Sequence, residues 1–223
     1  MTRDELEHII RASADVTDQY EFIIVGSQSI LGPVPNPPEV FTMSAEADIY
    51  PLQAPELADR IDGAIGEGSQ FHQTYGYYAQ GVGPETAVLP RGWIDRVHRV
   101  QSAATNQRVG YCLDLPDLFM SKAAAGRDKD REFCMAMLAH RYVRPEVVLD
   151  LVAAMPLDDA VRHPTVDHCS SGSPVEHRRS GPGTAGSPAT ALVSRAAQIT
   201  WRIVSSMSPA AWNGHCLTRS RRS

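Results

Sequence analysis

Hydrophobic and polar positions in the first 40 residues predict a helix, a strand and a long irregular connection. Residues 3–16 repeat apolar side chains at helical spacing and carry acids in the first turn, which indicates an amphipathic helix. Residues 20–26 (YEFIIVG) form a compact β-branched run that ends in glycine, the pattern of a buried strand. Residues 26–32 predict a single helical turn, and the prolines of 33–40 prevent that helix from continuing.

The middle of the chain alternates between strand and helix patterns. Residues 46–52 (EADIYPL) read as a strand, and residues 54–66 as a short helix with a proline in its first turn. Residues 75–82 and 85–90 are predicted to pair as a hairpin around a Gly-Pro turn. A last strand is predicted at 108–115.

Helical patterns close the regular part of the chain. Residues 115–141 have a helical pattern with an expected interruption near Gly126, and residues 144–155 form a closing helix. No internal repeat is visible. These elements predict an α/β (α+β) fold, in which helices flank a small mixed β-sheet.

Composition divides the chain near residue 163. Residues 163–223 are rich in Ser, Gly, Pro and Arg, a composition that cannot bury enough apolar surface to fold. We therefore predict one domain at 1–162 and a disordered or aberrant tail at 163–223, in which only residues 191–207 could form a short amphipathic helix. Arginine without lysine and few acids would also result if the end of a GC-rich gene were read out of frame.

Charge and cysteine content narrow the class of protein. The tail holds seven Arg, no Lys and two acids, a balance of +5, so the net charge of −5 leaves −10 on residues 1–162. No apolar run approaches the ~18 residues of a membrane span, and the charged N-terminus lacks a secretory signal, so we expect a cytoplasmic protein without membrane contact. The four cysteines lie far apart without a C-x-x-C pair, which indicates reduced structural thiols.

Two acids stand close together in the strand predicted at 46–52. Side chains two residues apart point to the same face of a strand, so Glu46 and Asp48 lie side by side while Ala47 and Ile49 face the other way. Like charges held together usually need a cation, and Mg²⁺ prefers oxygen ligands. The pattern predicts that Glu46 and Asp48 bind Mg²⁺, although an E-x-D pair alone is more often a solvated strand edge.

A Gly-Ser pair ends the preceding strand. Gly26 lets backbone amides approach a ligand closely, and the Ser27 hydroxyl with the following amides can hold a terminal phosphate. Alone, this pair is a routine turn. Its position before a strand with paired acids gives the layout of a phosphate and metal site.

A basic and acidic cluster follows on the predicted late helix. Lys122 lies among Met120 and three alanines, an apolar setting in which a charge needs a partner. Arg127, Lys129 and Asp130 follow in the segment GRDKD. These side chains could instead form an exposed helix face with weak i,i+3 and i,i+4 pairs.

The order of these motifs resembles the polymerase β-like nucleotidyltransferase superfamily. The motifs are the strand, "VGS" (25–27), "EAD" (46–48), Lys122 and "GRDKD" (126–130). Within this superfamily they are most similar to the small bacterial AbiEii-type toxins of toxin–antitoxin pairs. The resemblance covers roughly residues 15–140.

The resemblance implies a magnesium-dependent transfer of a nucleoside monophosphate from an NTP to an acceptor hydroxyl. The acceptor it suggests is the 3′ end of tRNA, and it suggests a cognate antitoxin protein as a partner. By the same resemblance Glu46, Asp48, Lys122 and Asp130 are the catalytic residues. Nucleotide binding falls to Gly26, Ser27, Lys122 and Arg127, with Lys122 as the phosphate anchor.

The chain also departs from the family pattern. Position 46 is Glu where Asp is usual, residues 28–45 make a long insertion, and a third carboxylate is represented only by Glu85 or Asp95. A domain of charge −10 binds RNA poorly unless a local patch of Arg91, Arg96, Arg99 and Arg108 compensates, so a protein or small-molecule acceptor stays open. A catalytically silent nucleotide-binding module and a pure interaction protein also stay open. Tyr75, Tyr77 and Tyr78 are expected to pack on the sheet, with a nucleotide pocket as the alternative.

Overall fold

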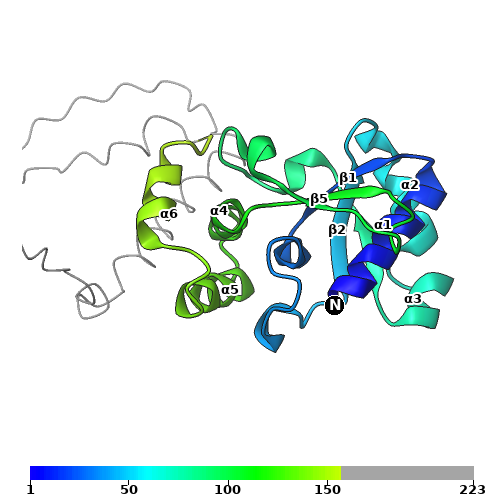
Figure 1. Ribbon diagram of the computed structural model, residues 1–223, viewed down its shortest axis with the longest axis horizontal. Coiled ribbons are helices and arrows are strands. Elements are labelled where there is room, and N and C mark those ends of the chain that lie inside the picture. Colours follow the sequence, from blue (N-terminus) through cyan, green and yellow to red (C-terminus); the bar gives the residue numbers. More distant parts are fainter. Residues whose placement is uncertain (157–223) are drawn as a thin grey trace, which may run out of the picture.

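A five-stranded mixed sheet forms the centre of the computed structural model, which describes residues 1–156 (Figure 1). Its strand order is β3-β2-β1-β5-β4. The β1–β2 and β5–β4 pairs are antiparallel, and the β1–β5 and β2–β3 pairs are parallel. The strands are β1 (Glu21–Val25), β2 (Glu46–Pro51), β3 (Tyr78–Gly81), β4 (His98–Val100) and β5 (Val109–Cys112).

Helices flank this sheet in two groups. In Figure 1, α1, α2 and α3 lie beside the strands, while α4, α5 and α6 gather beyond the end of β5. The helices are α1 (Arg3–Thr17), α2 (Ala58–Ile65), α3 (Gln70–Tyr75), α4 (Leu115–Ala125), α5 (Asp128–Ala139) and α6 (Pro145–Val152). The expected α/β fold, a small mixed sheet with flanking helices, is confirmed.

The two faces of the sheet have different environments. A Cβ atom on Gly110 of β5 would lie 2.5 Å from Ile10 of α1 and 2.7 Å from Ile24 of β1, so α1 packs closely on this face. Ile24 is paired with Ile49 of β2, which places Ile49 on the same buried face. The pleat then directs Asp48 to the opposite face.

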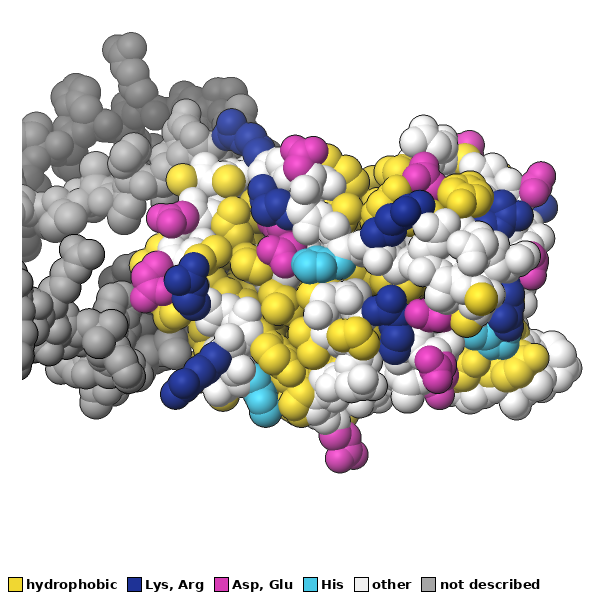
Figure 2. All heavy atoms as spheres, in the orientation of Figure 1, with side chains coloured by type: hydrophobic (Ala, Val, Ile, Leu, Met, Phe, Trp, Pro, Cys, Tyr) yellow, Lys and Arg dark blue, Asp and Glu magenta, His cyan; other side chains and the backbone are white. Residues whose placement is uncertain are grey.

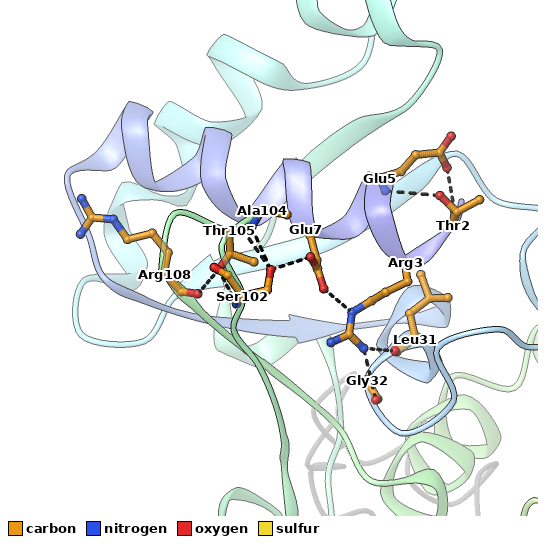
Figure 3. Close-up of polar contacts among 10 residues, drawn as sticks. All are labelled: Thr2, Arg3, Glu5, Glu7, Leu31, Gly32, Ser102, Ala104, Thr105 and Arg108. Carbon is orange, nitrogen blue, oxygen red and sulfur yellow. Dashed lines mark hydrogen bonds and ion pairs between the residues drawn. The ribbon is translucent and has the colours of Figure 1, made fainter.

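A short 3-10 helix, η1 (Ser27–Leu31), follows β1 and is held by α1 (Figure 3). The Arg3 guanidinium donates to the Leu31 carbonyl at 2.6 Å and to Glu7 at 2.9 Å. Glu7 also accepts a hydrogen bond from Ser102 in the β4–β5 loop at 2.7 Å. These contacts fix the segment that begins with Ser27 against both the first helix and the sheet.

The predicted hairpin at 75–90 is wrong. β3 pairs in parallel with β2, and α2 and α3 make the crossover between these two strands. Residues 85–90 form no strand: Pro84 opens a 3-10 turn (Pro84–Thr86), and Val88 and Leu89 pack against the core outside the ladder. The short strand β4 was not predicted, and it supplies the antiparallel partner of β5 instead.

The interruption predicted near Gly126 is present. Gly126 has φ +67°, a left-handed conformation that favours glycine, and it separates α4 from α5. Cys112 and Cys134 are buried free thiols, and burial raises the pKa of each to about 12. Both are therefore unreactive structural residues.

The described residues contain no helix with the length and hydrophobicity needed to cross a bilayer. The predicted tail at 163–223, with its amphipathic segment 191–207, lies outside the described residues.

Candidate functional site

A cavity of about 390 Å³ opens where β2 and η1 meet α4 and the start of α5. Hydroxyl, acidic and basic side chains line it, together with three small apolar residues. The lining residues are Ser27, Ser44, Glu46, Asp48, Glu85, Thr86, Val88, Ser121, Lys122, Ala124, Ala125, Arg127 and Lys129.

The two acids of β2 lie on the cavity side of the sheet. Ala47 and Ile49, between and after them, are fully buried on the other face, as the alternation of the strand requires. Burial, a hydrogen bond with Glu46 and the negative charge of Glu46 raise the pKa of Asp48 to about 7, while Lys122 and Arg127 oppose this shift. A cation beside the two carboxyl groups would favour the ionised form of Asp48, so the pair is a candidate cation site.

Gly26 determines how closely Asp48 can approach the end of β1. Asp48 is paired with Val25 across the β1–β2 ladder, and a Cβ atom on Gly26 would lie 1.9 Å from Asp48 Oδ2. Gly26 also has φ +66° and ψ −163°, a region that is essentially restricted to glycine. Glycine is thus required here by its backbone conformation and by contact with the Asp48 carboxylate.

Lys122 connects η1 to the late helices. Its ammonium donates to Ser27 Oγ at 2.8 Å and lies 3.2 Å from Asp130 Oδ1. It also lies 5.4 Å from the centre of the Phe133 ring, in a cation–π arrangement. Lysine has three N–H donors, and two of them are used within the described part of the chain, so the third is free for a ligand in the cavity.

Asp130 holds two cations at once. Its side chain is almost completely buried, and it accepts hydrogen bonds from Arg127 at 2.6 and 3.3 Å in addition to the contact with Lys122. Although burial acts in the opposite direction, the Arg127 hydrogen bond and the Lys122 charge lower the pKa of Asp130. The same Asp130 hydrogen bond raises the pKa of Arg127, so this carboxylate and this guanidinium stabilise each other's charged forms.

The structure brings the sequence-predicted site residues together around this cavity. Glu46, Asp48, Ser27, Lys122 and Arg127 line it. Gly26 and Asp130 lie directly behind the lining, in contact with Asp48 and Lys122 respectively.

The two candidates for a third carboxylate are in different places. Glu85 lines the cavity from the 3-10 turn Pro84–Thr86, whereas Asp95 is not among the lining residues. Within residues 1–156, no three His, Cys, Asp or Glu side chains are grouped closely enough to hold a metal ion by themselves. A metal here would depend on two carboxylates.

Sequence reasoning missed several residues of the cavity. Ser44 lies two residues before Glu46, and Ser121 lies one residue before Lys122. The hydrophobic periodicity does not predict that either serine lines a cavity. Behind the lining, Tyr78 of β3 donates a hydrogen bond to Glu46 Oε2 at 3.3 Å, a contact that the expected packing on the sheet does not predict. Burial and the nearby Glu46 charge raise the pKa of Tyr78 to about 12, so its hydroxyl keeps its proton at neutral pH.

The expected arginine patch is partly used inside the protein. The Arg96 guanidinium forms two hydrogen bonds, at 2.8 and 2.7 Å, with the fully buried Asp117. Arg108 lies over the ring of Tyr20, with its Cζ atom 5.6 Å from the ring centre. On the face drawn in Figure 2, acidic and basic side chains are interspersed and no large basic area is visible.

The fold and the site define an α/β domain that places paired acids opposite a lysine, an arginine and a hydroxyl. A family model described as "Nucleotidyltransferase of unknown function (DUF6036)" matches residues 4–160, well over half of the chain. The chain therefore belongs to this nucleotidyltransferase family, which implies a nucleotide substrate. Comparison with curated proteins and with solved structures gave no match.

Replacing Gly26 tests the contact with Asp48. Gly26→Ala is expected to lower the free energy of unfolding by about 1–3 kcal/mol, because alanine is strained in this backbone region. Its Cβ atom would also push the Asp48 carboxylate aside. Urea denaturation measures the change. Gly63→Ala on α2 is the control, because a Cβ there meets nothing within 4 Å and alanine favours the helix. Equal stability of Gly26→Ala and wild type would contradict the assigned contact.

The raised pKa of Asp48 predicts a pH-dependent stability. The folded protein keeps a proton on Asp48 up to about pH 7, whereas the unfolded chain releases it near the ordinary value of 3.8. The folded state therefore binds more protons between these values, and stability falls as the pH rises from about 4 to about 7.

Asp48→Asn removes this term. In metal-free buffer, the difference in free energy of unfolding between the variant and wild type should shift in favour of the variant by on the order of 2 kcal/mol from pH 5 to pH 8. Thermal melting at both pH values measures the gain, with Asp59→Asn on the exposed surface of α2 as the control. If the stability difference between Asp48→Asn and wild type does not change with pH, the pKa of Asp48 is not raised in the folded protein.

Proposed function

We propose that this protein transfers a nucleoside monophosphate from an NTP to an acceptor hydroxyl, with Mg²⁺ as cofactor. The observation that carries the proposal is the position of Glu46 and Asp48 across one cavity from the Ser27–Lys122 pair. The acceptor oxygen forms a bond with the α-phosphorus, the bond between this phosphorus and the bridging oxygen breaks, and pyrophosphate leaves. The hydroxyl proton passes to solvent.

The acid pair suits magnesium. Glu46 and Asp48 would supply oxygen ligands. Burial, and then the hydrogen bond and charge of Glu46, raise the pKa of Asp48, and a bound cation would oppose this shift by favouring the ionised carboxylate. Two carboxylates together with substrate phosphates and water are an ordinary magnesium ligand set. When bound, Mg²⁺ would neutralise charge on the phosphates.

The basic side chains suit a triphosphate. Ser27, with the backbone amides after Gly26, would hold the β- and γ-phosphates, as its position beside Lys122 supports. The free N–H of Lys122 would donate to a phosphate oxygen, and Arg127 would add a second positive charge on the cavity wall. Asp130, which pairs with Lys122 and Arg127, would hold these two side chains in position.

We further propose that the acceptor is the 3′ end of a tRNA and that the protein is an AbiEii-type toxin controlled by a cognate antitoxin. The resemblance of "VGS", "EAD", Lys122 and "GRDKD" to that group supports this assignment. A single-stranded 3′ end can reach a cavity with few protein contacts, so an extensive basic surface is unnecessary. Lys129 and Arg127 supply positive charge where such an end would enter.

Label transfer tests the reaction directly. Wild-type protein is incubated with Mg²⁺ and each α-labelled NTP, with and without total bacterial RNA, and the products are separated on a gel. We expect label on a tRNA-sized band with one of the four nucleotides. Asp48→Asn should reduce this label at least 100-fold, because it removes a charge from the acid pair, while Asp59→Asn should not.

Each alternative gives a different result in this assay. Label on the protein itself would redirect the acceptor to a protein hydroxyl. Absence of label with all four nucleotides, in protein shown to be folded and to bind an NTP, would favour the catalytically silent module. Absence of any effect of NTP or Mg²⁺ on the melting temperature would favour a pure interaction protein.

A further inference from the structure

Tyr78 on the edge strand β3 lies across the ladder from Glu46 on β2. The two residues are paired in the parallel β2–β3 ladder, and the Tyr78 backbone N–H donates to the Ala45 carbonyl at 3.0 Å. Paired residues of neighbouring strands project to the same face, so the Tyr78 side chain stands beside Glu46 on the cavity side of the sheet.

The Tyr78 hydroxyl reaches the end of the Glu46 side chain. It donates to Glu46 Oε2 at 3.3 Å, which is longer than the ~2.7–2.8 Å typical of an O–H···O hydrogen bond. Glutamate has one more rotatable bond than aspartate, so its carboxylate has more positions to choose from. A donor at this point restricts the choice to positions beside Asp48.

The Tyr78 ring is itself held by helix α3. His72 packs on it with ring centres 4.6 Å apart. The His72 ring is fixed in turn, because its Nδ1 accepts a hydrogen bond from the Gly68 N–H at 3.0 Å. The His72 backbone N–H donates to Ser69, the N-cap of α3, at 3.1 Å. A continuous series of contacts therefore runs from the start of α3 to the Glu46 carboxylate.

We propose that Tyr78, supported by His72, is a positioning residue that sets the Glu46 carboxylate for metal binding. The inference rests on the proposed function, because it assumes that Glu46 is a magnesium ligand. Carboxylates that bind metals are usually oriented by hydrogen bonds from neighbouring groups, and loss of such a group lowers metal affinity 10–100-fold. Tyr78 also accounts for a glutamate at position 46, since the longer side chain is what reaches the hydroxyl.

The test measures metal affinity rather than activity. Mn²⁺ serves as the probe, and electron paramagnetic resonance of the free ion gives its dissociation constant for the full chain. Tyr78→Phe removes only the hydroxyl and is expected to weaken Mn²⁺ binding about tenfold. Tyr77→Phe is the matched control, because the Tyr77 hydroxyl contacts His8 Nδ1 at 2.7 Å, away from Glu46. It is expected to leave the affinity unchanged.

A second pair of variants shows whether Tyr78 acts through Glu46. In a Glu46→Asp background the shorter side chain cannot reach the hydroxyl, so adding Tyr78→Phe should cause no further loss. An equal loss in both backgrounds overturns the proposal, and so does an equal loss for Tyr78→Phe and Tyr77→Phe. Wild-type affinity in Tyr78→Phe overturns it while leaving the metal site intact. Failure of the wild-type protein to bind Mn²⁺, both alone and with a non-hydrolysable NTP analogue, overturns the metal site of the proposed function together with it.

Discussion

The contact between the Asp48 carboxylate and the bare backbone of Gly26 is the constraint on which the site depends. The Asp48 carboxylate lies so close to the end of β1 that a Cβ atom on Gly26 would lie 1.9 Å from its Oδ2 atom. Because Ser27 follows directly, the same turn places a hydroxyl next to the acids and within 2.8 Å of Lys122. The absence of a side chain at position 26 thus lets Asp48 and Ser27 line the same cavity.

The charged side chains around the cavity are partly buried and depend on one another for pairing. Lys122 and Asp130 are both removed from water, and a buried ion is strongly destabilising unless it is paired. Asp130 pairs with Lys122 and Arg127, whereas Glu46 and Asp48 mainly face each other. Two cations share the single Asp130 carboxylate, so the basic side of the cavity keeps one positive charge beyond this pairing, while the acidic side holds two neighbouring carboxyl groups. A metal ion with a bound triphosphate would complete both sides.

Individual helices and strands could be predicted from the sequence because the patterns that indicate them lie within a few neighbouring residues. Helical spacing marked α1, the β-branched run marked β1, and Gly126 marked the break between α4 and α5. Strand pairing was not accessible in the same way. Residues 85–90 look like a strand by composition, and a short hairpin with β3 would be the simplest pairing. The α2–α3 crossover instead lets β3 pair with β2. The three-residue strand β4 is too short to leave a pattern.

The candidate site shows the same division. The paired acids and the Gly-Ser turn follow from spacing within one segment, and Lys122 was marked by its apolar neighbours. Two other features depend on segments far apart in the chain, which spacing does not bring together. One is the hydrogen bond from Tyr78 to Glu46, and the other is the use of Arg96 by Asp117.

Calorimetric titration with a non-hydrolysable NTP analogue tests the central claim, a single nucleotide and metal site, most directly. The wild-type protein should bind the analogue of one of the four nucleotides in the presence of Mg²⁺ and bind it at least tenfold more weakly in EDTA. Glu46 and Asp48 would hold the Mg²⁺, which would neutralise charge on the phosphates. Lys122→Met should weaken binding in both conditions. The same affinity with Mg²⁺ and with EDTA, or no binding of any analogue by the folded protein, would contradict a joint nucleotide and metal site.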